Sequence, residues 1–339
     1  MWCLARQKSR MSKFARNLTS LFIAGIILIG SGLVALHHQY FIDLYTASQF
    51  KASSEMQQVE EQLHLTDKGS FLLHASQAQL VGSDTFNNKC NKKEKNSVVL
   101  GCYIYPQNLY VYNVDDPNLD GVIQTTTAHE MLHAAYARLS KGEKDNVNKL
   151  IDQVLPSALK QDESLEKRLE LYDRIEPGER YNELHSIIGT EVKDLSDEIE
   201  IYYKQYFIDR QIVVSYAAKY IKVMTDLQKQ QDALVEELNQ SSVQIEAATN
   251  QYNQDVSTLN SDIQSFNLRA QNGQFSSEAA FNEERNAIQV RIDSLRSQQL
   301  AINNDIENYN NKRQELLALN VRVKELNSKL DSTSIQQVE

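Results

Sequence analysis

The clearest pattern in this chain of 339 residues is an apolar side chain at every seventh position of its C-terminal part. Apolar residues with this period are typical of α-helices that pack as a coiled coil. An earlier segment repeats the pattern, and the turn-forming pair Asn272 and Gly273 separates the two. We therefore predict an antiparallel coiled-coil helical hairpin over residues 201–334, with its turn near 271–277. The seam positions are Leu238, Ile245, Tyr252, Leu259 and Phe266 in the first arm and Phe281, Ile288, Leu295, Ile302, Tyr309, Leu316, Val323 and Leu330 in the second.

Polar residues occupy several other core positions of this seam, namely Ser242, Gln299, Arg313 and Asn320. Such residues loosen the packing of a coiled coil but help to fix its register. The same seam can also pair with another chain. A coiled-coil partner or a homo-oligomer is therefore the alternative to an internal hairpin.

Residues 18–36 form an almost unbroken apolar run without a charge, which is long enough to cross a bilayer as a helix. Five basic residues precede this run, whereas Asp43 and Lys51 are the first charges after it, so the positive-inside rule places the N-terminus in the cytoplasm. We predict a basic cytoplasmic tail over 1–17, one transmembrane helix over 18–36 and a juxtamembrane helix over 37–65. The protein is thus expected to be a single-pass plasma-membrane protein with its other domains outside the cytoplasm. A cleaved signal peptide is the alternative, and a start at Met11 leaves this topology unchanged.

The middle of the chain alternates between strand and helix signals. Residues 98–105 and 109–114 are rich in β-branched and aromatic side chains and flank Pro106, which predicts a β-hairpin. A turn-rich stretch then leads to a strongly helical segment preceded by three threonines, Thr125, Thr126 and Thr127, whose hydroxyls can cap a helix. We expect a small α+β domain over residues 66–200.

The helical segment carries His129, Glu130 and His133. Four residues make about one helical turn, so both imidazoles leave the same face of the helix and can bind one metal ion. Glu130 lies beside them, where it can act on a metal-bound water. This spacing predicts a zinc site with His129 and His133 as ligands and Glu130 as the catalytic residue.

The order of strand, strand and motif helix resembles the zincin peptidases, and in particular membrane-anchored, gluzincin-like metallopeptidases of bacteria. The resemblance implies a Zn²⁺ cofactor and an edge strand that pairs with extended substrate. It also implies that a metal-activated water hydrolyses the peptide bond while Glu130 takes up its proton and passes it to the leaving amine. Leu139 stands where metzincins have a third histidine, which excludes that subclass.

The third metal ligand is expected in residues 181–191, because a catalytic zinc usually takes three protein ligands. Asn182 and Glu183, with the Gly189 that follows, resemble the ligand helix of thermolysin, although the glutamate-to-glycine spacing is one residue shorter here. Glu183 is the favoured ligand, and Glu191 and His185 are the alternatives. Tyr136 and His185 are candidate oxyanion stabilisers, with core packing the more natural role for Tyr136.

Two further features concern surroundings and partners. Cys90 and Cys102 are twelve residues apart and can form a disulfide that restrains the rim of the cleft, the alternative being two buried thiols. The net charge of −10 argues against a nucleic-acid partner.

Together these patterns favour a membrane-anchored, extracytoplasmic zinc endopeptidase that acts on protein or peptide substrates. The alternative is a membrane-tethered coiled-coil scaffold whose metal site is structural or inactive. The two differ at Glu130, because a purely structural metal site has no use for a general base.

Overall fold

The structure is a computed structural model that describes residues 37–90, 99–162, 164–175 and 177–332, together with isolated positions between 22 and 34. It divides into two compact units. Unit 1 comprises the described residues up to Tyr220 and those from Ser328 onwards, and unit 2 is Ile221–Asn327.

Most elements of unit 1 are short helices, and several of them begin at a capping side chain. Ser53 accepts a hydrogen bond from the backbone N–H of Met56, and Ser140 forms a capping box with Glu143. In chain order the elements are α2 (His38–Gln49), α3 (Ser54–Leu63), α4 (Asp67–Ala75), β1 (Gln79–Val81), α5 (Ser83–Lys89), β2 (Gly101–Ile104), β3 (Asn108–Tyr112), the 3₁₀ turn η1 (Pro117–Leu119), α6 (Val122–Arg138), α7 (Lys141–Gln161), α8 (Leu165–Ile175), α9 (Arg180–Thr190), α10 (Asp197–Tyr203), α11 (Arg210–Gln271) and α12 (Glu278–Leu330).

The sheet has three strands in the order β1-β3-β2. β2 and β3 form the antiparallel hairpin predicted from the sequence, with Cys102 opposite Tyr110, and β1 pairs parallel to β3 with Leu80 opposite Val111. Both β1 and β2 are therefore edge strands of this sheet. The disulfide between Cys90 and Cys102, one of the two arrangements expected, is present and joins the end of α5 to β2.

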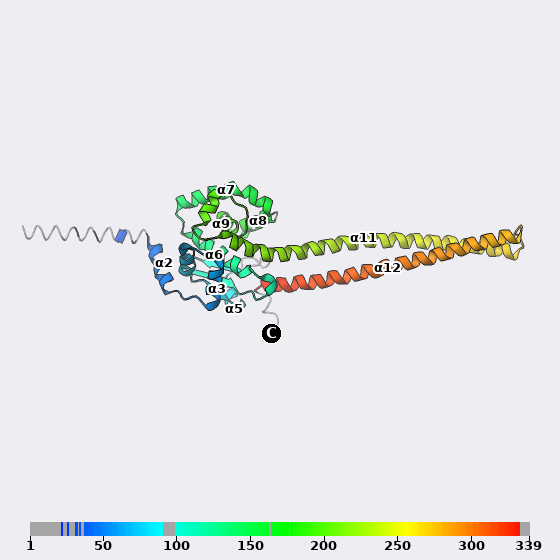
Figure 1. Cartoon of the computed structure of the whole chain (residues 1–339), viewed down its shortest axis with the longest axis horizontal. Helices are drawn as coiled ribbons and strands as arrows, with labels where there is room; N and C mark the ends of the chain where they lie inside the picture. Colours follow the sequence, from blue (N-terminus) through cyan, green and yellow to red (C-terminus); the bar gives the residue numbers. More distant parts are fainter. Residues whose placement is uncertain are drawn as a thin grey trace, which may run out of the picture. The chain divides into compact units, whose positions relative to one another are not determined.

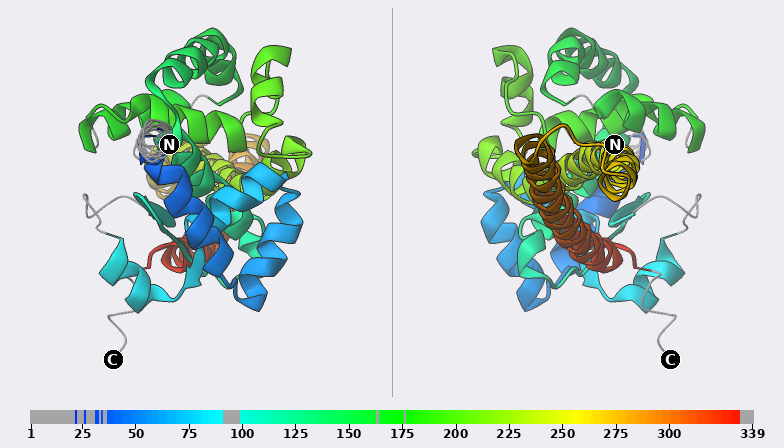
Figure 2. Two further views of the ribbon diagram at one scale, coloured as in Figure 1. Left: turned by 90° about the vertical axis from the view of Figure 1, so that its left-hand side faces the viewer. Right: turned by 90° about the vertical axis from the view of Figure 1, so that its right-hand side faces the viewer.

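Helix α6 lies at the centre of unit 1, with α2–α5 on one side and α7–α9 on the other (Figures 1 and 2). It is buried over most of its length, and its buried residues include polar side chains such as Thr127, Glu130 and His133 beside the apolar ones. Its N-cap is Gly121, not one of the threonines, and Gly121 has φ +98°, a left-handed conformation that suits glycine. The predicted capping residues Thr125 and Thr127 instead lie buried inside the helix.

Helix α9 packs closely on α6. The contact depends on Gly189, because a Cβ at this position would lie 2.4 Å from Cδ1 of Leu132 on α6. Tyr203 closes the other side of Gly189 and donates a hydrogen bond to the backbone carbonyl of His185. This close approach brings the first turns of α9 next to the histidines of α6.

The expected α+β fold class is wrong. Of the residues that the structure describes, 78% are helical, and the sheet has only three short strands. The sequence correctly predicts the β2–β3 hairpin. The residues around this hairpin, however, form helices that pack around α6, where the sequence predicts a domain of mixed helices and strands. Residues 37–65 also form two helices, α2 and α3, instead of one, with a break at 50–53.

The predicted transmembrane helix and the single-pass plasma-membrane location are also corrected. Among the residues that the structure describes, none of the helices combines the length and the apolar character needed to cross a membrane. Most of the apolar run over 18–36 lies outside the described residues.

Unit 2 consists of the parts of α11 and α12 that lie within Ile221–Asn327, and these run side by side in opposite directions (Figure 1). The predicted turn lies between Gln271 and Glu278, where the two helices end and begin. Three phenylalanines, Phe266, Phe275 and Phe281, pack together near the turn with ring centroids 5.1–5.3 Å apart. Ion pairs link the arms, including Lys312 with Glu237 at 2.7 Å. Of the predicted seam positions, Leu238, Leu259 and Phe266 are buried.

Candidate metal site

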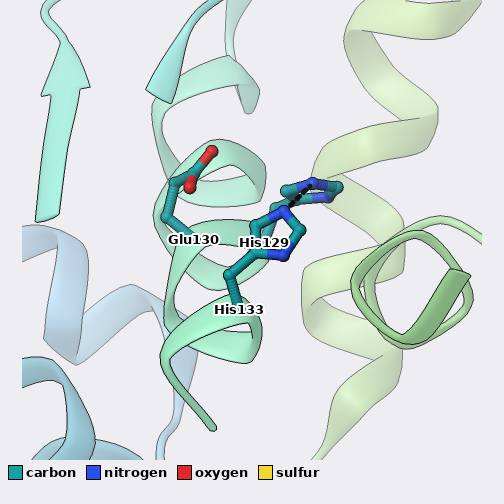
Figure 3. A group of neighbouring side chains, drawn as sticks. All are labelled: His129, Glu130 and His133. Atoms are coloured by element: carbon teal, nitrogen blue, oxygen red, sulfur yellow. Dashed lines mark hydrogen bonds between the residues drawn. The ribbon is translucent and has the colours of Figure 1, made fainter. Parts of the chain in front are cut away.

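The two histidines of α6 face each other across one helical turn. The Nε2 atoms of His129 and His133 are 3.0 Å apart, and Figure 3 shows both imidazoles on the same side of the helix. Together with Glu130 they form a group whose potential ligand atoms all lie within 4.8 Å of one another. This His/Glu/His cluster can hold a metal ion.

Glu183 reaches the same place from the first turn of α9. Its carboxylate oxygens lie 3.7 Å from Nε2 of His129 and 3.5 Å from Nε2 of His133. Ligand atoms around a tetrahedral zinc, at about 2.0–2.1 Å from the metal, are separated by roughly 3.3 Å. The three side chains are thus spaced much as ligands of one such ion would be.

The surroundings of these side chains support a metal. Oε2 of Glu183 is buried and has no hydrogen-bond partner within the described chain, although a buried carboxylate oxygen normally has one. Nδ1 of His133 lies 2.9 Å from Oδ1 of Asn182, so the side chain of Asn182 can fix the ring with Nε2 directed at the site. A partner on the second imidazole nitrogen is the usual arrangement for a metal-binding histidine.

The charges of this group depend on one another. Burial alone would raise the pKa of Glu183, but the neighbouring His129 and His133 outweigh it and the pKa is lowered. Burial alone would lower the pKa of His129, but Glu183 and Glu130 outweigh it and the pKa is raised. Glu183 is therefore held as a carboxylate, the form in which it can bind a cation.

Glu130 has a different environment, because its side chain also lies against Gly101 of strand β2. Burial raises the pKa of this carboxylate, although the nearby charges of His133 and His129 and the backbone N–H of Tyr103 oppose the shift. Gly101 of β2 permits this position, since a Cβ there would lie 2.6 Å from Cγ of Glu130. The carboxylate is thus held next to the edge strand and close to the histidines.

Strand β2 is itself fixed at both ends. Cys102 carries the disulfide to Cys90. At the other end, Arg138 donates two hydrogen bonds of 2.8 Å to the buried carboxylate of Asp43, one of 2.7 Å to the hydroxyl of Tyr103 and one of 2.8 Å to the carbonyl of Pro106. Since Tyr103 and Gly101 both contact Glu130, these links also restrain the position of its carboxylate.

The other candidates from the sequence lie in different surroundings. Glu191 forms an ion pair of 2.8 Å with Arg168. His185 is fully buried with Nε2 2.8 Å from the hydroxyl of Tyr202, and burial lowers its pKa to about 3. Tyr136 donates a hydrogen bond to Oδ1 of Asn148. The structure therefore brings Glu183 to the histidines and places these three in contacts of their own.

Some residues of the site were not found from the sequence. Gly101 and Tyr103 contact Glu130 through the backbone geometry of β2, which leaves no signal in residue type. Tyr172 of α8 is a second example, because burial and the nearby charge of Glu183 raise the pKa of its hydroxyl. No pattern in the sequence indicates that this side chain lies near Glu183.

No protein-family model matches the chain, and no curated protein and no solved structure matches it either.

Proposed function

We propose that this chain is a zinc-dependent endopeptidase that hydrolyses peptide bonds of protein or peptide substrates, with His129, His133 and Glu183 as ligands and Glu130 as general base. The observation that carries the proposal is the position of Glu183, whose carboxylate lies 3.5 and 3.7 Å from the two imidazoles and is otherwise unpartnered at Oε2. Two imidazoles and one carboxylate are a common ligand set of catalytic zinc, which keeps one position open for water.

When bound, the metal would supply a Lewis acid that lowers the pKa of a water molecule. The chain's own contribution is Glu130, whose raised pKa suits a group that must take up a proton near neutral pH. Its carboxylate would accept the proton of the attacking water and then donate it to the nitrogen of the leaving amine. The close contact with Gly101, beside the backbone N–H of Tyr103, keeps the carboxylate in place for both transfers.

The location of β2 supports a peptide as the substrate. β2 is an edge strand and lies directly beside Glu130. An extended polypeptide can add to such an edge through main-chain hydrogen bonds. A substrate bound in this way would pass the general base with its peptide groups aligned along β2.

The first test combines metal analysis with cleavage of a peptide library by the full chain and by Glu130→Gln. We expect about one zinc per chain in both proteins. Loss of a general base typically costs about 10²–10⁴-fold in rate, so Glu130→Gln should lose cleavage by a factor in this range. Equal cleavage by the two proteins would refute the role of Glu130, and protein without bound metal after zinc loading would refute the site.

A structural metal site on a coiled-coil scaffold is the second candidate, and the helical hairpin of unit 2 favours it. In that case, both proteins would bind zinc and neither would cleave peptides. Removal of zinc would then lower only the thermal stability of unit 1.

A further inference from the structure

A second recess in unit 1 shares no residue with the metal site. It is a polar groove of about 540 Å³ between the C-terminal end of α2, the loop that follows it, and strand β1. We call it the β1 groove and define it by its lining residues, Thr46, Gln49, Phe50, Lys51, Ser53, Gln77, Ala78, Gln79 and Leu80.

The β1 groove borders an open edge of the sheet. The backbone carbonyl of Val81 accepts a hydrogen bond from Asn113, beyond the end of β3. In a parallel pair, alternate residues of a strand turn their N–H and C=O groups toward the same neighbour. The backbone N–H and C=O groups of Val81 and Gln79 therefore point toward β3. Those of Leu80 point to the opposite side of β1, where the sheet has no further strand. Leu80 also lines the groove, so the open edge of β1 lies beside it.

The side chains of the β1 groove match the chemistry of a peptide backbone. Three of them, Gln49, Gln77 and Gln79, carry carboxamides, which offer both a donor and an acceptor as peptide groups require. Thr46 and Ser53 already serve other contacts, since Thr46 accepts from Gln107 at 2.6 Å and Ser53 caps α3. Gln49 also has a partner, because its Nε2 donates a hydrogen bond of 3.3 Å to the hydroxyl of Ser48. Gln77, Gln79 and Leu80 therefore remain as the main polar contacts for a bound molecule.

The only charged residue among those lining the groove is Lys51, which is exposed. A positive charge at the rim favours a partner with an acidic side chain. We infer that the β1 groove binds an extended, acidic segment of another protein, which adds as a fourth strand next to β1 and places a carboxylate against Lys51. This inference does not depend on the proposed peptidase activity, because the groove and the metal site have no residue in common.

The test uses a phage-displayed library of random nonapeptides, selected on the full chain carrying Glu130→Gln so that bound peptides are not cleaved. We expect enrichment of sequences with an acidic residue. The enriched peptides, made synthetically with a fluorescent label, are then titrated by anisotropy against four variants of this chain.

Leu80→Pro removes the outward N–H and should weaken binding at least about tenfold, whereas Leu80→Ala keeps this N–H and should stay within about threefold. Lys51→Glu should also weaken binding about tenfold through charge repulsion. His129→Ala should leave the affinity unchanged.

Several outcomes would overturn the inference. They are the absence of enriched peptides, equal binding to Leu80→Pro and Leu80→Ala, and loss of binding in His129→Ala, which would place the peptides at the metal site. If Leu80→Pro does not fold by circular dichroism, Lys51→Glu decides, because Lys51 is exposed and undiminished affinity of that variant also refutes the inference.

Discussion

Two carboxylates of the same segment, Glu183 and Glu191, have opposite surroundings in this structure. Glu183 lies against two imidazoles and keeps an unpartnered oxygen, whereas Glu191 is neutralised by Arg168 at 2.8 Å. Removal of one ligand from a three-ligand zinc site weakens the site strongly, because the remaining ligands cannot complete the coordination. The two glutamates therefore make a matched pair of variants.

We predict that Glu183→Gln lowers zinc affinity by at least about a hundredfold, whereas Glu191→Gln leaves it within about threefold. The measurement is competition with a chromophoric zinc chelator at constant pH. Equal affinities of the two variants would mean that Glu183 is not a ligand, and the reverse order would assign this role to Glu191.

His185 gives a prediction about pH. Burial and the charges of His133 and His129 lower its pKa to about 3 in the folded chain, whereas an unfolded histidine titrates near about 6.5. Below pH 6.5 the unfolded chain binds a proton that the folded chain does not, so the native state loses stability as the pH falls toward 3. Above pH 6.5 this loss is absent.

For one such group, the free energy of unfolding should fall by about 2 kcal/mol between pH 7.5 and pH 5.0. His185→Phe should remove this part of the pH dependence while the other groups continue to titrate. The check is urea unfolding of both proteins at the two pH values, in the presence of a chelator so that metal loss does not contribute. An identical pH dependence of the two proteins would contradict the buried, neutral state of His185.

The residues of the site differ in how far the sequence could predict them. His129, Glu130 and His133 follow from local helical spacing, which is independent of the rest of the fold. Glu183 is brought near them only by the packing of α9 on α6 at Gly189, so the sequence left it beside Glu191 and His185 as alternatives. Contacts made through backbone atoms, such as that of Tyr103 with Glu130, leave no residue signature.

At the scale of elements, β2 is the strand on which the geometry of Glu130 depends. Its Gly101 packs against Glu130 and Thr126. A Cβ added at Gly101 would lie 2.6 Å from Cγ of Glu130 and 2.6 Å from Cγ2 of Thr126. Contacts of this length do not occur in folded proteins, so either the strand or the glutamate would have to move. Gly82, by contrast, has nothing within 4 Å of the corresponding position.

We therefore predict that Gly101→Ala lowers the rate of peptide cleavage by at least about tenfold with zinc content unchanged, because it displaces the general base and not the ligands. Gly82→Ala is the matched control and should retain the activity of the unaltered chain. The measurements are kcat on a fluorogenic peptide and zinc per chain. Full activity of Gly101→Ala would show that the position of β2 does not control Glu130.

The elements also show why the fold class was mispredicted. The β2–β3 hairpin was found because β-branched and aromatic residues flank a proline turn, and the long helices because their heptad period is regular. The helices around α6 give weaker patterns, since a helix packed on several sides lacks a distinct polar face. Strand β1 has only three residues and could not be recognised from alternation, so neither its pairing with β3 nor the groove beside it was expected.

At the scale of the whole molecule, the apolar packing between the two helices of unit 2 is incomplete at one position of the seam. Gln299, a core position predicted from the heptad pattern, is exposed in the structure and borders a recess between the arms that is lined by Tyr252, Val256, Ile292 and Leu295. A leucine at this position would cover apolar surface that the glutamine leaves accessible. Each 40 Å² of apolar surface removed from water contributes about 1 kcal/mol.

Gln299→Leu should therefore stabilise the hairpin by about 1 kcal/mol and raise the midpoint of its helix unfolding. Gln298→Leu changes the adjacent residue, which does not line this recess, and should give no such increase. Thermal unfolding followed by circular dichroism at 222 nm compares the two variants with the unaltered chain. A higher midpoint for Gln298→Leu than for Gln299→Leu would argue against the heptad register assigned here.

Unit 1 is not continuous in sequence, because Ser332 returns to α5 and exchanges two hydrogen bonds of 2.8 and 2.7 Å with Asn87. After Tyr220 has been added to the growing chain, the ribosome must still synthesise Ile221–Asn327 before the segment that contains Ser332 exists. This takes roughly 5 to 20 s at ordinary rates of synthesis. During this interval the nascent domain contains His129, His133 and Glu183 but lacks Ser332, the residue that bonds to Asn87 of α5. The order of translation thus allows the metal site to form before the domain around it is complete.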